Sequence, residues 1–388
     1  MRVVIASLHG PDSIGGLASY NRTLCRELRA MGAQCDQLSI QGSKKEPVDN
    51  LRSHPHPGST LQWRGIWTEL FNHMASRPFL HGQLERFCSV ALPLNQVIPI
   101  TGPANVIHFI GTGWDYAGFA LHHAARKLGA RFTVWPAVHP ESWGDDVIDL
   151  RLYRQADYVF CQSNFERNHL AARGAPLHKL IVCGAAPERE PDGDGEAFRD
   201  RHDLAGQPVA LFLGRRDEGK GYPALLKAWK IVIGQCPQAV LLLAGIGGAE
   251  YADLLADLPP TSVRDLGTPD DREKADALAA CDIFCLPSAH ESFGIAYVEA
   301  WSYGKPVICG TAPASRELIE DGRTGLWSDG SAESIAGQIL ALLTEPSLRA
   351  AVGDAGRALQ QTRFTAVAMA AAHLAAWTGD LGENKSES

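Results

Sequence analysis

Two glutamates flank a segment that is suited to bind an anionic ligand with hydroxyl groups. Glu291 and Glu299 lie on either side of an expected helix start, where the backbone N–H groups of Phe293, Gly294 and Ile295 should point outward. Such a start binds anions, because its first N–H groups lack intrahelical partners and the helix dipole is positive there. An ionised carboxylate only accepts hydrogen bonds, so Glu299 suits a ribose diol. The segment therefore indicates a ligand such as a nucleotide sugar.

A simpler explanation of these carboxylates is helix capping. Ser292 could be the N-cap, and carboxylates near a helix N-terminus are favoured by its dipole. Glu299 fits this less well, because we expect it two turns inside the helix. The two glutamates could also be the acid and base of a glycosidase. A hydrolase of that kind has no use for the phosphate-binding residues described next.

Arg215 and Lys220 follow an expected strand that ends at Gly214. Their spacing nearly matches the P-loop pattern, but Gly221 stands where that loop needs a serine or threonine to hold Mg²⁺. A nucleotide hydrolase is therefore disfavoured. Two interpretations stay open: a metal-free diphosphate clamp, in which arginine supplies a fork of donors and lysine a point charge, or a solvated polar loop.

The first half of the chain holds weaker signals. Gly15 and Gly16 follow the first expected strand, and paired glycines before a helix let a ligand approach the backbone, although a plain tight turn explains them as well. The dinucleotide pattern GxGxxG is absent, which disfavours NAD-dependent hydride transfer. His139 follows an apolar run, 132–138, and is expected at the carboxyl end of a strand, facing the cleft. The alternative is a histidine with a purely structural role. Asp192-Gly193-Asp194 matches the metal-binding DxD pattern, but it lies in an expected linker, where Asp-Gly is ordinary turn chemistry.

The elements that must position these residues alternate between short apolar runs and helical patterns. This order is typical of parallel sheets covered by helices on both faces, so the fold class is α/β with two doubly wound domains. A polar piece rich in proline and glycine, 187–195, separates the domains near residue 190. Ligands bind beyond the carboxyl ends of the strands in such sheets, so we expect the active site in the cleft between the domains. The expected strands are 2–8, 34–40, 105–110, 131–138, 157–162, 179–183, 208–213, 239–244, 262–266, 282–286 and 305–309, and the expected helices include 16–30, 115–128, 164–173, 222–234, 270–280 and 331–344.

The composition argues against some classes of binding partner. The 388 residues carry a net charge of −8, which argues against nucleic acid or an anionic membrane as the main partner. We expect neither a membrane-spanning helix nor a signal peptide, and nine cysteines without CxxC pairs are typical of a reducing cytoplasm. Aromatic and arginine residues interleave in 50–100, which leaves open an acceptor lid, a membrane-surface helix or helices that cover the first sheet. Membrane association is thus possible but not indicated.

Taken together, the motifs resemble the retaining glycosyltransferases of family 4, which have the GT-B fold of two Rossmann-like domains. The resemblance covers the second domain almost wholly and the first in patches. One departure is Pro313-Ala314-Ser315-Arg316, where the family often has a glycine pair before the glutamate that matches Glu317. The matching pieces are Gly15-Gly16, His139, the loop 214–221, Glu291 to Ala300, Gly304 to Ile308 and Glu317 to Leu326.

The resemblance implies a role for each matching residue. Arg215 and Lys220 would hold the donor diphosphate, and Glu291 and His139 would contact the transferred sugar. Glu299 would bind the ribose. Donor-binding backbone would come from Gly15, Gly16, Ser292, Phe293, Gly294, Ile295, Gly267 and Thr268.

The resemblance also implies domain roles and partners. Domain 1–190 would bind the acceptor, domain 191–365 the donor, and 366–388 would be a helix that packs back on the first domain plus a disordered tail. The donor would be a UDP- or GDP-sugar, and the acceptor a small molecule, a glycan or a lipid-linked acceptor, with no metal or cofactor. The alternatives are another enzyme on the same fold, such as a nucleotide-sugar epimerase or a phosphorylase, and a non-catalytic nucleotide-sugar binding protein.

Overall fold

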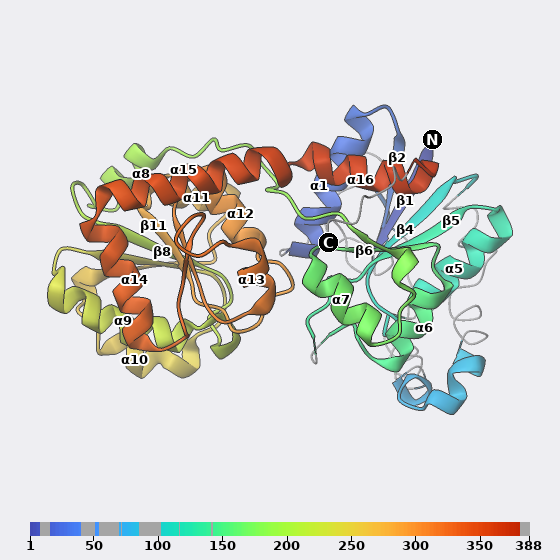
Figure 1. The fold of residues 1–388 in the computed structure, drawn as a ribbon, viewed down its shortest axis with the longest axis horizontal. Helices are drawn as coiled ribbons and strands as arrows, with labels where there is room; N and C mark the ends of the chain where they lie inside the picture. The colour runs from blue at the N-terminus through green and yellow to red at the C-terminus, as the bar shows by residue number, and fades with distance from the viewer. Residues whose placement is uncertain are drawn as a thin grey trace. The chain divides into compact units, whose positions relative to one another are not determined.

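The computed structural model describes residues 1–7, 16–39, 51–53, 70, 72–84, 102–115, 117–140 and 143–380 (Figure 1). The chain forms two compact units. The first contains Met1–Glu188 together with Ala366–Ser388, and the second contains Arg189–Thr365. Each unit has its own parallel sheet, so each is described separately.

The first unit contains a seven-stranded parallel sheet in the order β3-β2-β1-β4-β5-β6-β7. The expected strands are present within a few residues of their predicted ends, and β3 is an addition that the sequence did not indicate. The strands are β1 (Arg2–Ser7), β2 (Gln34–Ser39), β3 (Leu51–Ser53), β4 (Val106–Ile110), β5 (Arg131–Trp135), β6 (Tyr158–Cys161) and β7 (Leu180–Val182), and the helices include α1 (Gly16–Ala30), α5 (Ala117–Leu128), α6 (Val147–Gln155), α7 (Asn164–Ala172) and α16 (Ala366–Thr378).

Strand β1 is apolar throughout its centre because both faces of its sheet are covered. Val3 and Ile5 belong to one buried cluster, whereas Val4 and Ala6 belong to another. This alternation follows from the two-residue period of a strand, which sends successive side chains to opposite faces. Helices α1 and α16 lie side by side over the face of Val3 and Ile5 (Figure 1).

The second unit contains a six-stranded parallel sheet in the order β10-β9-β8-β11-β12-β13. Its last strand, β13, has only two residues, so no alternating pattern in the sequence could predict it. The strands are β8 (Val209–Leu213), β9 (Val240–Ala244), β10 (Val263–Gly267), β11 (Ile283–Leu286), β12 (Val307–Cys309) and β13 (Leu326–Trp327). The helices are α8 (Gly195–Arg201), α9 (Tyr222–Gln235), α10 (Ala252–Ala256), α11 (Asp271–Ala280), α12 (Ile295–Ser302), α13 (Pro313–Leu318), α14 (Ala332–Thr344) and α15 (Pro346–Arg363).

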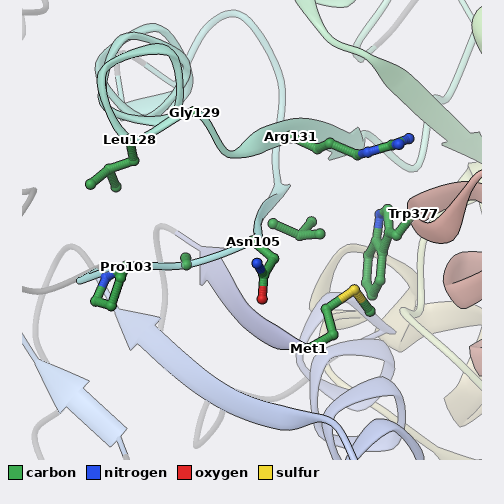
Figure 2. Close-up of a pocket in the computed structure, with 9 residues that line it drawn as sticks. Met1, Pro103, Asn105, Leu128, Gly129, Arg131 and Trp377 are labelled. Atoms are coloured by element: carbon green, nitrogen blue, oxygen red, sulfur yellow. The ribbon is translucent and has the colours of Figure 1, made fainter.

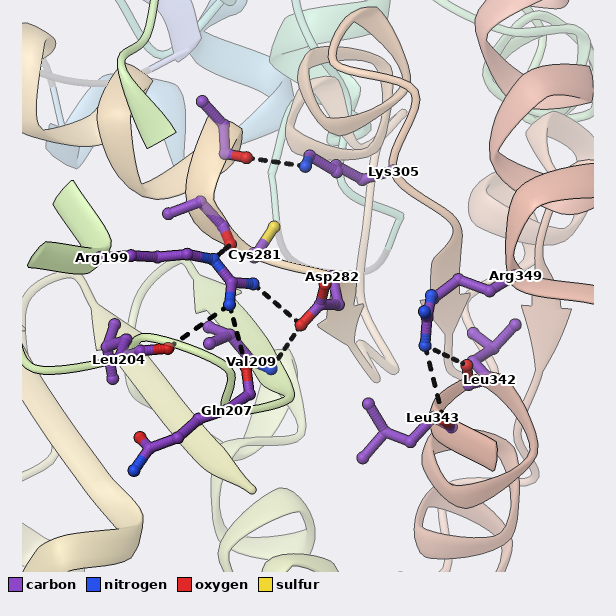
Figure 3. A network of polar contacts seen from close by, with 12 residues as sticks. Arg199, Leu204, Gln207, Val209, Cys281, Asp282, Lys305, Leu342, Leu343 and Arg349 are labelled. Atoms are coloured by element: carbon purple, nitrogen blue, oxygen red, sulfur yellow. Dashed lines mark hydrogen bonds and ion pairs between the residues drawn. The ribbon is translucent and has the colours of Figure 1, made fainter. Parts of the chain in front are cut away.

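Arg199 of α8 joins the amino ends of two central strands in this sheet. Its guanidinium donates to the Ala280 carbonyl at 2.9 Å and to the Asp282 carboxylate at 2.9 Å, and Asp282 also accepts from the Val209 N–H at 2.7 Å (Figure 3). The same guanidinium donates to the Gln207 carbonyl at 2.9 Å. This network ties α8 and α11 to β8 and β11 at the amino edge of the sheet.

Candidate functional site

The loop after β8 contains the predicted clamp residues and has a tightly defined backbone. Asp217 accepts a hydrogen bond from the Lys220 N–H at 2.9 Å, which caps a single 3₁₀ turn. Gly221 follows in the left-handed region with φ +71°, and an added Cβ would lie 2.2 Å from the Pro287 carbonyl oxygen. A serine or threonine would be strained and would clash there. The departure from the P-loop pattern at this position thus has a steric cause.

The loop after β8 is joined to the loop after β11 by the backbone and by one ion pair. The Gly219 carbonyl accepts from the N–H groups of Ala289 and His290 at 2.9 and 3.2 Å. The Lys220 ammonium lies 2.6 Å from the Glu291 carboxylate, and the two side chains are only 14% and 7% exposed. The two residues are 71 positions apart in sequence, so their pairing depends on the adjacency of β8 and β11 in the sheet.

Glu291 has a second partner, Ser288. The Ser288 hydroxyl donates to the same carboxylate oxygen as Lys220 does, at 3.0 Å. The Lys220 ammonium also donates to the His290 carbonyl, at 3.3 Å. These contacts hold the lysine and the carboxylate in one arrangement at the carboxyl end of β11.

Helix α12 begins later than the sequence suggested. Its N-cap is Gly294, with φ +95°, and Ile295 is the first helical residue. The interpretation of Ser292 as the N-cap is therefore wrong, and Glu299 is in the second turn rather than two turns inside. The left-handed N-cap requires glycine, because an added Cβ would lie 2.4 Å from the Tyr297 ring. Ser292 and Phe293 are buried beside this helix start.

Glu299 pairs with a lysine that the sequence analysis did not select. The Lys274 ammonium of α11 donates to the Glu299 carboxylate at 2.7 Å, and the Glu299 side chain is 12% exposed. Lys274 lies seven residues beyond Gly267, in a helix with no motif around it. Its charge and its place in the first turns of α11 were the available signals, and neither distinguishes it from a surface lysine.

The neighbouring arginines differ sharply in environment. Arg215 has a side chain that is 65% exposed and lies 3.4 Å from Asp217. Arg216, which the sequence analysis passed over, is 7% exposed and forms a double hydrogen bond with Asp265 of β10. That bond holds the pKa of Asp265 below its usual value. The predicted base-contacting residues Gly267 and Thr268 follow Asp265 at the exposed carboxyl end of β10.

The predicted residues of the first unit are placed as follows. Gly16 is the first residue of α1, and Gly15 lies outside the described residues. His139 follows β5, as expected, and its ring Nδ1 lies 3.2 Å from the Ala137 carbonyl. Asp146 begins α6 as part of a capping box, and Asp145 lies 2.8 Å from His169. Asp145 and Asp146, which follow His139 in the chain, thus have structural partners.

The metal-binding alternatives find no support. Asp194 is the N-cap of α8, accepting from the Ala197 N–H at 3.0 Å, and Asp192 lies 3.2 Å from Arg189. Cys281 and Cys285, which lie near His290 in the sequence, are buried, whereas His290 is exposed. In the described part of the chain, no group of three metal-binding side chains is found.

A pocket of about 600 Å³ lies at the amino edge of the first sheet and contains none of the predicted residues (Figure 2). It lies where β1, β4 and β5 begin, whereas His139 follows the other end of β5. Ligands of parallel sheets bind at the carboxyl edge, so we give the pocket less weight than the loops above. Its lining is Met1, Pro103, Ala104, Asn105, Val106, Leu128, Gly129, Arg131 and Trp377.

Comparison with known proteins decides the family. Residues 194–359 match the model of the glycosyl transferases group 1, and residues 15–185 match that of a glycosyl transferase 4-like domain. A GDP-mannose-dependent phosphatidylinositol monomannoside mannosyltransferase of Mycolicibacterium smegmatis is 30% identical over 277 residues, covering 64% of this chain and 72% of that protein. The chain belongs to the group 1 glycosyltransferases. The family resemblance seen in the motifs is confirmed.

Other relatives of this chain agree with the family, over shorter alignments. A phosphatidyl-myo-inositol mannosyltransferase of Mycobacterium tuberculosis is 35% identical over 192 residues, covering 46% of this chain. The alignment spans about half of that relative, 51% of its length.

Solved structures confirm the GT-B fold class of this chain. Sucrose-phosphate synthase of Thermosynechococcus elongatus has a TM-score of 0.76 at 20% identity, covering 97% of this chain and 98% of that one. HepE of Anabaena in complex with UDP has a TM-score of 0.75 at 17% identity, covering 98% and 100%. Among the described residues, none of the helices has the length and apolar character needed to cross a membrane.

Proposed function

We propose that this protein is a retaining glycosyltransferase that moves a hexose from a UDP- or GDP-sugar to an acceptor hydroxyl. The observation that carries the proposal is the buried pair of Lys220 and Glu291, held between two loops at the carboxyl ends of β8 and β11. Both residues match positions of the family motif. The second unit would bind the donor and the first unit the acceptor.

The pair keeps hydrogen-bonding capacity for a ligand. A lysine ammonium has three N–H donors. In the described chain, two of those of Lys220 go to the Glu291 carboxylate and the His290 carbonyl. The third is left for a phosphate oxygen. One oxygen of Glu291 accepts from both Lys220 and Ser288, which leaves the other for a sugar hydroxyl. Glu299 likewise uses one oxygen for Lys274, and its second suits a ribose hydroxyl.

Stabilisation of the departing diphosphate would supply most of the catalysis. The bond from the anomeric carbon to the diphosphate oxygen breaks, and the acceptor oxygen bonds to that carbon from the same face. A phosphate oxygen takes the hydroxyl proton. Lys220 and Arg215 would offset the charge that develops on the diphosphate, a preorganised electrostatic effect. His139 would contact the transferred sugar from the first unit.

Relatives suggest the substrate class. The similar mycobacterial proteins are named mannosyltransferases, one of them GDP-mannose-dependent, and HepE was solved with UDP and with UDP-glucose. A hexose donor and a glycan or lipid-linked acceptor are the corresponding proposals for this chain. We propose that it acts in carbohydrate biosynthesis in the cytoplasm. The reaction would need no metal, because the clamp is formed by side-chain cations.

Nucleotide binding tests the proposal directly. A thermal-shift series with UDP, GDP, ADP and dTDP in EDTA should show that UDP or GDP raises the melting temperature, because a ligand that binds the folded state stabilises it. The matched control is Lys230→Ala, which removes an exposed ion pair with Asp257. This variant should keep the shift, and Lys220→Ala should lose most of it. No shift with any of the four nucleotides would refute the proposal.

A further inference from the structure

A buried carboxylate in the first unit joins the carboxyl ends of two neighbouring strands. Glu166 is the third residue of α7 and is 1% exposed. One of its oxygens accepts from the Val138 N–H at 2.7 Å, and the other accepts from the Gln162 N–H at 2.6 Å. Gln162 follows β6, and Val138 directly precedes His139. One side chain therefore fixes the backbone next to the predicted sugar-contacting histidine.

The same face of α7 holds the segment beyond His139. His169 Nε2 lies 2.8 Å from the Asp145 carboxylate, and Arg173 donates to the Asp145 carbonyl at 3.1 Å. Glu166, His169 and Arg173 are three and four residues apart, the spacing that places side chains on one helix face. The helix thus holds the His139 segment at both ends, at Val138 and at Asp145.

The backbone around His139 has a conformation that needs such support. Ala137 has φ +51°, which is uncommon for a residue with a Cβ and costs free energy. His139 and Trp143 exchange two backbone hydrogen bonds, at 2.9 and 2.8 Å. Strained backbone persists only where its surroundings determine it, and the bond from Val138 to Glu166 lies one residue from the strain.

We propose that Glu166 is a positioning residue for His139, and that its two-oxygen bridge sets where the imidazole is presented. The inference rests on the proposed function, in which His139 contacts the transferred sugar. Above the pKa of about 7 to which burial raises Glu166, its ionised carboxylate can accept both N–H groups, but a glutamine has one acceptor oxygen and an amide nitrogen that only donates. Glu166→Gln must therefore lose one of the two bonds and release either Val138 or Gln162.

A chemically matched control exists in the neighbouring helix. Asp149 is the third residue of α6 and is fully buried, and its two oxygens accept from the Asp146 and Trp114 N–H groups at 3.1 and 3.2 Å. Asp149→Asn removes the same kind of bond without touching Val138. Its thermal destabilisation should resemble that of Glu166→Gln. A difference in activity between the two variants then reflects the position of His139 rather than the stability of the fold.

The experiment measures kcat and donor KM for the release of GDP from GDP-mannose and of UDP from UDP-glucose. Glu166→Gln should lower kcat about tenfold, since small misplacements of a reacting group are costly. It should leave donor KM within about twofold, because Arg215, Lys220 and Glu299, which we propose bind the nucleotide, lie in the second unit. Asp149→Asn should keep kcat within about twofold. In a His139→Ala background, Glu166→Gln should cause no further loss.

Each outcome bears on one claim. Equal losses of kcat in Glu166→Gln and Asp149→Asn, or losses that multiply with that of His139→Ala, overturn the positioning role. Absence of nucleotide release by the wild type contradicts the proposed function, whereas an active wild type with an unimpaired His139→Ala variant contradicts the role of His139 and with it that of Glu166. If Glu166→Gln does not fold, Glu166→Asp provides the same test, because its shorter side chain cannot hold both the Val138 and the Gln162 N–H groups, with the same expected loss of kcat alone.

Discussion

The Lys220 ammonium and the Glu291 carboxylate form a buried pair that joins the loops after β8 and β11. Both residues match family motifs, but the motifs do not reveal that they touch. Each residue holds the other in place, and we propose that each also keeps one hydrogen-bonding position for the nucleotide-sugar donor. Removing either residue leaves the other charge buried and unpaired, which is costly.

Lys220→Ala should lower turnover by about 100-fold or more, because a preorganised cation at a departing oxyanion is worth several kcal/mol. Nucleotide release from GDP-mannose and UDP-glucose measures this. Lys230→Ala removes a lysine of the same unit from an exposed pair and should stay within about twofold of the wild type. A Lys220→Ala variant with near-normal turnover would mean that the clamp is assigned to the wrong residue.

Glu299→Gln should weaken donor binding more than it slows chemistry. The ribose is remote from the bond that breaks. Loss of a contact to it therefore weakens binding of the ground state and of the transition state alike. Donor KM should rise about tenfold with kcat nearly unchanged, as measured by initial rates over a range of donor concentration. Glu320→Gln, at an exposed carboxylate paired with Arg323, is the control. A fall in kcat with unchanged KM would contradict the ribose role.

Gly221→Ala should destabilise the second unit more than Gly322→Ala does. Both glycines are left-handed, with φ of +71° and +75°, but an added Cβ meets the Pro287 carbonyl at position 221 and nothing at position 322. Backbone strain alone should cost about 1 kcal/mol, and the clash should add about 1–3 kcal/mol. Urea unfolding measures the difference. Equal effects would show that the packing of Gly221 on Pro287 is loose.

Two buried histidines of the first unit make stability depend on pH. Tyr20 lies between them, with its hydroxyl 2.6 Å from His373 Nε2 and 3.3 Å from His108 Nε2. Burial lowers the pKa of His373 to about 4 and that of His108 well below 6.5. Between pH 6.5 and about 4 the unfolded chain therefore binds protons that the folded chain does not, so these histidines reduce stability as pH falls, each by up to about 1.4 kcal/mol per pH unit.

Buried carboxylates act with the opposite sign in the same range. Burial raises the pKa of Glu166 from 4.5 to about 7, so the folded chain binds the proton first and stability rises as pH falls. The pH dependence of the wild-type free energy of unfolding is therefore the sum of both effects. We expect His373→Leu to show a smaller loss of stability between pH 7 and 5 than the wild type, in urea unfolding, while exposed His178→Gln keeps the wild-type slope. Identical slopes for all three would contradict the buried neutral state of His373.

The sequence predicts the strands and the family motifs well because their signals are local. Buried parallel strands are short apolar runs, and Gly214, Lys220, Glu291 and Glu299 lie within recognisable patterns. The pairs that hold these residues were not predictable in the same way. Lys274 and Glu299 are 25 residues apart, and the burial of Arg216 rather than Arg215 depends on β10 lying two strands from β8. Such contacts depend on strand order, which a linear pattern does not reveal.

The start of α12 shows a second feature that the local sequence did not predict. Serine is a favoured N-cap, and Ser292 precedes an apolar helical run, so capping statistics favour it. In the structure Gly294 is the N-cap and Ile295 the first helical residue, and the Tyr297 ring occupies the space that a side chain at position 294 would need. The Tyr297 hydroxyl donates to the Leu286 carbonyl at the end of β11, so a contact with the sheet accompanies this departure from the local capping preference.

The most direct test of the account is nucleotide release from GDP-mannose and UDP-glucose in the presence of EDTA, by the wild type, Lys220→Ala and Lys230→Ala. We expect release by the wild type with at least one donor, a loss of about 100-fold or more in Lys220→Ala, and wild-type rates in Lys230→Ala. Full activity of Lys220→Ala, or activity of the wild type that requires added Mn²⁺, would contradict a metal-free clamp built on Lys220.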